Sequence, residues 1–152
     1  MRREAIKLAE KPNYYRMTER LLYDYKTYDA AIRNLQARIE EIEPQLYPSN
    51  ELSADRVQTS QSITSTVERQ VILMSEEEGR IRKQLTEKRR LLRAVREART
   101  HLTQQESELV WMKYDMEKSH VEVQRALSMP HATYYRCKKQ VVDKVAKCMG
   151  II

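Results

Sequence analysis

Apolar residues recur every three or four positions along most of this 152-residue chain. This spacing puts them on one face of an α-helix, and no stretch shows the alternation that is typical of a β-strand. The first apolar stripe consists of Tyr25, Tyr28, Ile32, Leu35, Ile39, Ile42 and Leu46. It predicts a long helix that ends near Ile42, because Pro44 and Pro48 are expected to terminate it.

A second stripe predicts another long helix, from about Ile63 to Arg99. Its apolar members are Val67, Val71, Met74, Ile81, Leu85, Leu92, Val95 and Leu102, and Glu78, Lys88 and Arg99 interrupt it. The polar segment 48–62 between the helices is predicted to be a loop. Heptad-like stripes allow an intramolecular antiparallel hairpin, pairing with a second chain, or a hairpin that dimerises into a four-helix bundle.

The C-terminal third, residues 102–147, predicts a helix-turn-helix preceded by one further helix. A Ser or Thr stands three residues before a Glu at Thr103–Glu106 and at Ser119–Glu122. In such a capping box the hydroxyl accepts from a backbone amide and the Glu binds the cap amide, so each marks the beginning of a helix. The short connection 128–130 contains Pro130, which ends one helix and suits the first turn of the next.

Apolar spacing also predicts which faces of these helices are buried. On the predicted inner faces lie Val123 and Leu127 of the short helix, and Tyr134, Cys137 and Val141 of the next. Adjacent helical residues point about 100° apart, so Tyr134 is assigned inward and Tyr135 outward. For the preceding helix, 104–116, the predicted core face is Leu109, Val110, Met112 and Tyr114. Trp111 of that helix is either ordinary core or a docking residue for an upstream helix.

Composition supports an all-α fold and narrows the chemistry. Charged residues make up 33% of the chain, and Gly occurs only twice. The net charge is +6, and Lys and Arg outnumber Asp and Glu by nine to two in 80–99 and by seven to two in 118–147. Such a basic balance suits a polyanionic partner.

Several function classes lack their signatures. The three histidines and two cysteines, Cys137 and Cys148, show no metal-ligand spacing, so we expect reduced thiols and no metal. No Gly-rich phosphate loop or nucleophile–base set occurs, so we expect neither an enzyme nor a cofactor. No apolar run approaches the roughly 18 residues of a membrane span, and no signal peptide begins the chain. We therefore expect a cytoplasmic protein.

The segment LTQQESELVWMKYDMEKSHVEVQRALSMPHATYYRCKKQVVDKV resembles the DNA-binding end of bacterial sigma factors and of sigma-like phage regulators. The positions that follow this pattern include Leu102, Thr103, Tyr114, Ser119, Leu127 and the stretch 133–136. Gln124 departs from it, where a small Ala is usual, and Ser128 departs where Gly is common. We expect Gln124 to widen the angle between the two helices and Ser128 to act as a capping residue.

The upstream order narrows the resemblance. The stretches 13–15 and 21–26 lead into the first long helix, 53–57 lies in the polar segment after it, and 66–68 lies in the first turns of the second. This order resembles the RinA/ArpU-type late transcription regulators of phages and prophages of Gram-positive bacteria. The resemblance implies sequence-specific binding of double-stranded DNA that activates late phage genes in the host cytoplasm. The sigma-like end also implies contact with RNA polymerase.

In a helix-turn-helix, the N-terminal part of the second helix enters the major groove. The residues expected to contact DNA there are His131, Ala132, Tyr135, Arg136, Lys138 and Lys139. Arg136 is the best candidate to read a base, whereas Lys138 and Lys139 are expected to hold phosphates. Further possible phosphate contacts are Arg89, Arg93 and Arg96, unless that flank is only solvated or pairs with Glu40, Glu41 and Glu43.

Two domains are therefore expected. Residues 1–100 form a helical hairpin or oligomerisation region, and 101–152 form the DNA-binding domain of a homodimer or higher oligomer. Two other functions remain open. One is a phage small terminase subunit that recognises packaging-site DNA, and the other is a coiled-coil structural adaptor that does not bind DNA.

Overall fold

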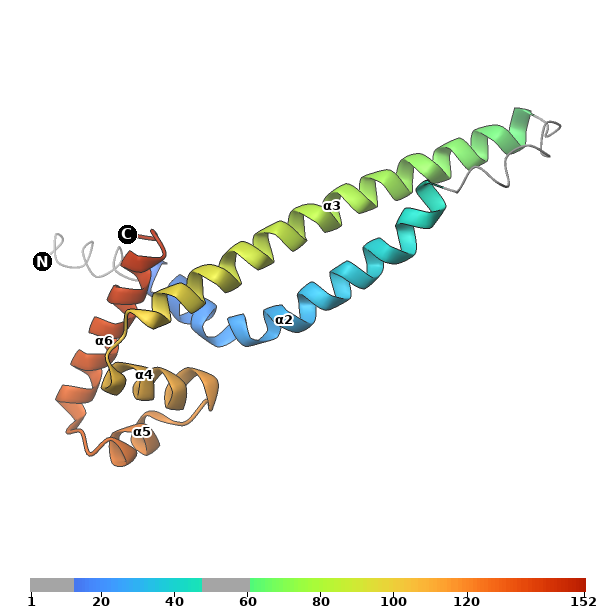
Figure 1. Cartoon of the computed structure of the whole chain (residues 1–152). Helices are drawn as coiled ribbons and strands as arrows, with labels where there is room; N and C mark the ends of the chain where they lie inside the picture. Colours follow the sequence, from blue (N-terminus) through green and yellow to red (C-terminus); the bar gives the residue numbers. More distant parts are fainter. Residues whose placement is uncertain (1–12, 48–60) are drawn as a thin grey trace, which may run out of the picture. The chain divides into compact units, whose positions relative to one another are not determined.

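The computed structural model describes residues 13–47 and 61–152, with the side chains of 61–64 excepted. Its elements, in chain order, are α2 (Asn13–Leu46), α3 (Gln61–Thr100), α4 (Gln104–Val110), the π-helical turn η2 (Trp111–Asp115), α5 (His120–Ala126) and α6 (His131–Cys148) (Figure 1). Every regular element in these two ranges is helical, which confirms the all-α prediction.

Contacts divide the chain into two compact units. The hairpin unit is Asp29–Arg89, and the terminal unit is Met1–Tyr28 with Arg90–Ile152. This division does not coincide with the boundary expected at residue 100. The terminal unit contains the helix-turn-helix together with the first described turns of α2 and the last turns of α3.

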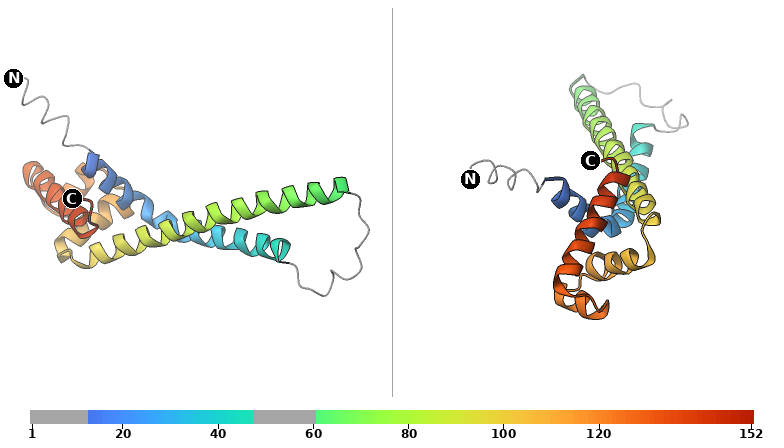
Figure 2. Two further views of the ribbon diagram at one scale, coloured as in Figure 1. Left: turned by 90° about the horizontal axis from the view of Figure 1, so that it is seen from above. Right: turned by 90° about the vertical axis from the view of Figure 1, so that its left-hand side faces the viewer.

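In the hairpin unit, α2 and α3 run antiparallel and side by side (Figures 1 and 2). Their seam buries Ile39, Ile42, Ile81 and Leu85, and Ile32, Leu35, Leu46 and Met74 pack around it. Across the seam Arg38 pairs with Glu77 at 2.9 Å. Arg82 pairs with Glu43, which confirms the expected partnership between the basic flank and this acidic cluster. The apolar stripes of α2 and α3 therefore bury each other in an intramolecular hairpin.

The prediction that the first helix ends near Ile42 was wrong. α2 continues through Pro44 to Leu46, and the Tyr47 amide still donates to the Glu43 carbonyl at 2.9 Å. Pro44 lacks an amide donor and its ring crowds the carbonyl four residues earlier, but the helix continues to Leu46, which packs on the seam. α3 begins at Gln61, so residues 61 and 62 are helical rather than part of a loop. The rest of the predicted loop, residues 48–60, lies outside the described residues.

The first members of the second stripe are not buried. Val67 is 52% and Val71 40% exposed, and Ile72 and Leu73 beside them are more than half exposed. Because α2 ends at Leu46, the described residues provide no second helix against this stretch of α3. Glu78, by contrast, is only 8% exposed, and its carboxylate accepts from Arg82 at 2.8 Å. This polar interruption of the stripe is thus satisfied within α3.

The terminal unit has two apolar clusters. The larger joins α2, α3, η2 and α6 through the buried residues Leu22, Val95, Ala98, Val110, Tyr114, Val141, Val142 and Val145. The smaller joins α4, α5 and α6 through Leu109, Val123 and Tyr134, with Met112, Leu127, Met129 and Cys137 packed around it. The inner faces expected for the three C-terminal helices are confirmed.

The helix expected over 104–116 changes type partway. After α4 the chain forms one π-helical turn, in which the Met116 amide donates to the Trp111 carbonyl at 2.9 Å. Single π-turns of this kind occur within α-helices. Trp111 is 48% exposed, so it is not a core residue, while Tyr114 in the same turn is fully buried.

The packing of Leu22 predicts that distant residues share one folding unit. Leu22→Ala should cost about 2–5 kcal/mol, because it leaves a cavity in a core that 95, 141 and 145 complete. Urea unfolding followed by the fluorescence of Trp111, the only tryptophan, should shift to lower denaturant concentration. Val121→Ala, at a 58% exposed position of the same unit, is the control and should leave this transition in place.

Candidate nucleic-acid interface

Both expected capping boxes are present. The Glu106 amide donates to the Thr103 hydroxyl and the Thr103 amide to the Glu106 carboxylate, at 3.3 and 3.1 Å. The Ser119 and Glu122 groups repeat this arrangement at 3.3 and 3.0 Å. α5 therefore begins at His120, at the place that the sequence indicated.

The turn between α5 and α6 depends on a left-handed residue. Ser128 has a φ of +51°, and the Met129 amide donates to the Gln124 carbonyl at 2.9 Å, which closes the end of α5. Pro130 is the N-cap of α6, with no side-chain hydrogen bond to the helix. Pro130 therefore stands at the predicted helix start. The expected capping by Ser128 was wrong, since Ser128 instead occupies the conformation that favours Gly.

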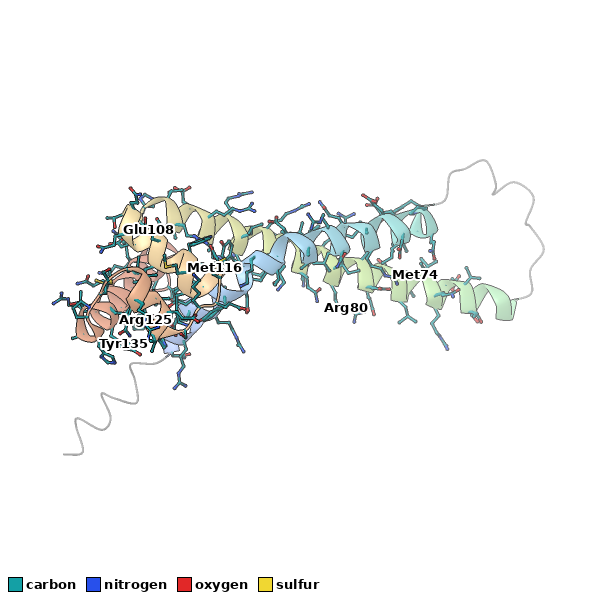
Figure 3. All side chains as sticks on the ribbon, turned by 90° about the horizontal axis from the view of Figure 1, so that it is seen from below. Met74, Arg80, Glu108, Met116, Arg125 and Tyr135 are labelled. Carbon is teal, nitrogen blue, oxygen red and sulfur yellow. The ribbon has the colours of Figure 1, made fainter. Side chains whose placement is uncertain are left out.

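α6 has one buried and one exposed face over its first turns. Tyr134 is fully buried, whereas Tyr135 is 40% exposed, as predicted for this adjacent pair. Figure 3 labels Tyr135 on α6 and Arg125 on α5, both within the terminal unit. The other exposed residues on this part of α6 are His131, Ala132, Arg136 and Lys139. Five of the six expected contact residues are thus accessible.

The sixth, Lys138, does not belong to the exposed face. Only 8% of it is accessible, and its ammonium lies 2.8 Å from the Glu19 carboxylate of α2. It also lies 5.6 Å from the centre of the Tyr15 ring. One helical turn after the inward Tyr134, position 138 falls on the same buried face. The expectation that Lys138 holds a phosphate was therefore wrong.

A histidine–tyrosine cluster supports the exposed Tyr135. The His131 and His120 rings lie 4.7 and 5.3 Å from the Tyr135 ring, and a 2.7 Å hydrogen bond joins His120 Nδ1 to the Tyr134 hydroxyl. Burial, together with the charges of Lys113 and Lys138, lowers the pKa of His120. Burial raises the pKa of Tyr134. Both shifts favour the neutral forms of the imidazole and the phenol that share this hydrogen bond.

The sequence did not predict that α2 packs against the helix-turn-helix. Glu19 accepts from the Tyr114 hydroxyl at 2.7 Å as well as pairing with Lys138. The Tyr14 hydroxyl donates to the Asp143 carboxylate at 2.9 Å. A sequence signal existed in the density of tyrosines between 14 and 28, but spacing alone does not reveal a contact that spans about 100 residues.

A second group of polar contacts holds the end of η2. Arg99 pairs with Asp115 at 2.7 Å, and the Tyr25 hydroxyl donates to the same carboxylate at 3.1 Å. Arg99 also donates to the Tyr25 hydroxyl. Lys26 donates to the Tyr114 carbonyl at 3.1 Å and pairs with Glu117. Arg99, which interrupts the apolar stripe of α3, is thus a structural ion-pair residue.

The further phosphate candidates are all exposed on α3. Arg89 belongs to the hairpin unit, and Arg93 and Arg96 belong to the terminal unit. The C-terminal basic block is partly neutralised, since Lys144 pairs with Glu106 at 3.0 Å, as Lys138 does with Glu19. The exposed cations of α6 are accordingly fewer than its sequence suggests.

Other chemistry receives no support from the described parts of the chain. They contain no group of His, Cys, Asp or Glu suited to a metal ion, and both cysteines have free thiols. None of the helices in those parts combines the length and apolar character that a membrane crossing requires. No protein-family model, curated protein or solved structure matches this chain. The interpretation of the site therefore rests on its geometry.

The left-handed turn predicts a stabilising substitution. Ser128→Gly should remove a conformational cost of about 1–2 kcal/mol, offset by about 0.4–1 kcal/mol of unfolded-chain entropy. The free energy of unfolding should therefore increase by about 0.5–1 kcal/mol, and the melting temperature should rise. The same change at Ser107, inside α4, should instead destabilise the unit. A lower melting temperature for Ser128→Gly would contradict this account of the turn.

The Glu19–Lys138 pair predicts a coupled effect on stability. Lys138→Met should cost about 1–3 kcal/mol, because it leaves the largely buried Glu19 carboxylate without its cation. Adding Glu19→Gln should recover part of that loss, since a neutral amide needs no counter-charge. A double-mutant cycle from urea unfolding measures the coupling. Additive costs of the two changes would show that the pair contributes nothing.

Proposed function

We propose that this protein is a sequence-specific regulator of transcription that binds double-stranded DNA through α5 and α6. The observation that supports the proposal most strongly is the division of α6 into two faces. Its inner face is anchored by Tyr134 and Val141, and its first three turns present His131, Ala132, Tyr135, Arg136 and Lys139 outward. A helix held on one side and free on the other suits insertion into a major groove.

The exposed residues divide into two chemical roles. The Arg136 guanidinium matches the O6 and N7 acceptors of guanine, and Ala132 leaves room for a thymine methyl group. His131 and Tyr135 reach a base edge or a phosphate. Lys139 supplies a phosphate contact that sets register without reading sequence. No side chain caps the amides at the beginning of α6, so the positive end of its dipole also faces this surface.

The proposed biological setting follows from the resemblance of the sequence to the RinA/ArpU-type late transcription regulators. We propose activation of phage or prophage late genes in a bacterial host, with contact to RNA polymerase. Exposed Trp111, in the π-turn of the same unit, gives such a contact an aromatic anchor.

We also propose that the chain acts as a dimer or higher oligomer. Ile39 and Ile42 fill the core of the hairpin and are not available for that purpose. The exposed stretch Val67–Leu73 of α3 continues the apolar seam, and only Glu68 and Arg69 carry charge between 65 and 75. A second copy of the chain packed against this stretch would bury these side chains. Two DNA-binding units joined in this way bind two half-sites with raised effective concentration.

Selection of bound sequences from random duplexes tests the proposed function. Arg136→Ala should weaken binding to the selected duplex by about 1–3 kcal/mol and relax the preference at one base pair. Lys139→Ala should weaken all duplexes nearly equally and reduce the salt slope by about one unit. Arg80→Ala, an exposed arginine of the hairpin unit (Figure 3), controls for the loss of one charge.

Three results would count against the proposal. If Arg136→Ala binds the selected duplex as tightly as the parent protein does, α6 does not read the sequence of that duplex. The absence of binding to any duplex at low salt would favour the structural adaptor. Ring-shaped higher oligomers on the DNA, seen by measuring the mass of the complex, would favour a small terminase subunit.

A further inference from the structure

A second basic surface lies on the first described turns of α2. Arg16 and Arg20, together with Asn13 and Met17, line one open hollow in the terminal unit. Both arginines are exposed, and within the described ranges neither takes part in an ion pair. Residues four apart share one face of a helix, so the two guanidinium groups extend from adjacent turns.

This surface is held firmly against α6. Glu19, between the two arginines in sequence, pairs with Lys138 of α6 at 2.8 Å. Tyr15 contacts the same lysine, and the Tyr14 hydroxyl binds Asp143 one turn later. The side chains that face inward are thus used to attach α2 to α6, while Arg16 and Arg20 beside them are left at the surface.

This part of α2 contacts the turn of α6 that presents Lys139. Glu19 pairs with Lys138, the residue before Lys139, and the hydrogen bond of His120 to the Tyr134 hydroxyl places the beginning of α5 against the preceding turn of α6. Lys113 lies 5.6 Å from the ring of Tyr23, three residues after Arg20, and donates to the Lys118 carbonyl. Lys113 and Lys118 thus add two partly exposed cations to the terminal unit, which also presents Arg136 and Lys139 of α6.

We propose that Arg16 and Arg20 bind the phosphate backbone of the same duplex whose major groove receives the start of α6. This inference rests on the proposed function and adds a second, sequence-independent contact to it. A guanidinium binds phosphate oxygens in a bidentate fashion and is weakly hydrated, which suits a repeating anion. Asp24, one turn further along α2, marks the end of the basic surface.

The test compares full-length variants on the duplex enriched by the selection above. In fluorescence anisotropy titrations, Arg16→Gln with Arg20→Gln should weaken binding at about 0.1 M salt by roughly tenfold. The slope of log K against log salt should fall by about two units, at about 0.9 for each phosphate contact. Base preference should not change, because these residues touch no base. Hydroxyl-radical footprinting should show one backbone segment that the parent protects and the variant leaves open.

A charge-matched variant separates a contact from a general effect. Arg80→Gln with Lys83→Gln removes two exposed cations from the hairpin unit and should keep the parent affinity and slope. If both double variants lose affinity equally, or if the α2 variant keeps the parent slope and footprint, the contact does not exist, although DNA binding by α6 stands. If the parent binds no duplex, the proposed function and this inference fail together.

Discussion

The terminal unit depends on the need to neutralise one largely buried carboxylate. Glu19 pairs with Lys138 at 2.8 Å and accepts from the Tyr114 hydroxyl at 2.7 Å, so a single side chain connects α2, η2 and α6. A buried charge without a partner is costly, and this requirement specifies how α2 crosses α6. Leu22, three residues after Glu19, packs in the apolar core with Val141 and Val145.

The same constraint decides which residues of α6 are available to a ligand. Lys138 is committed to Glu19, and Tyr134 is committed to the core and to His120. The exposed set is therefore narrow and ordered, with Tyr135 held between two histidine rings.

Local signals predicted much of the fold correctly. The two capping boxes, the inward Tyr134 and the helix start after Pro130 each follow from interactions within a few residues, which spacing reveals. Predictions failed where the outcome depended on a distant partner. Pro44 did not end α2, because Leu46 packs on the seam of the hairpin. Val67 and Val71 continue an apolar pattern, yet α2 ends before it could cover them.

The amino-acid sequence alone determined the helical class, the places where the C-terminal helices begin and the face of α6 that turns inward, because these depend on backbone hydrogen bonds and on helical period. Only the tertiary structure decided that Lys138 is structural, that Arg99 binds Asp115 and that the helix-turn-helix shares its core with α2. Each of those contacts joins residues of different helices. Charge and periodicity identify a lysine on a helix, but only its neighbours in space decide whether it faces solvent or a carboxylate.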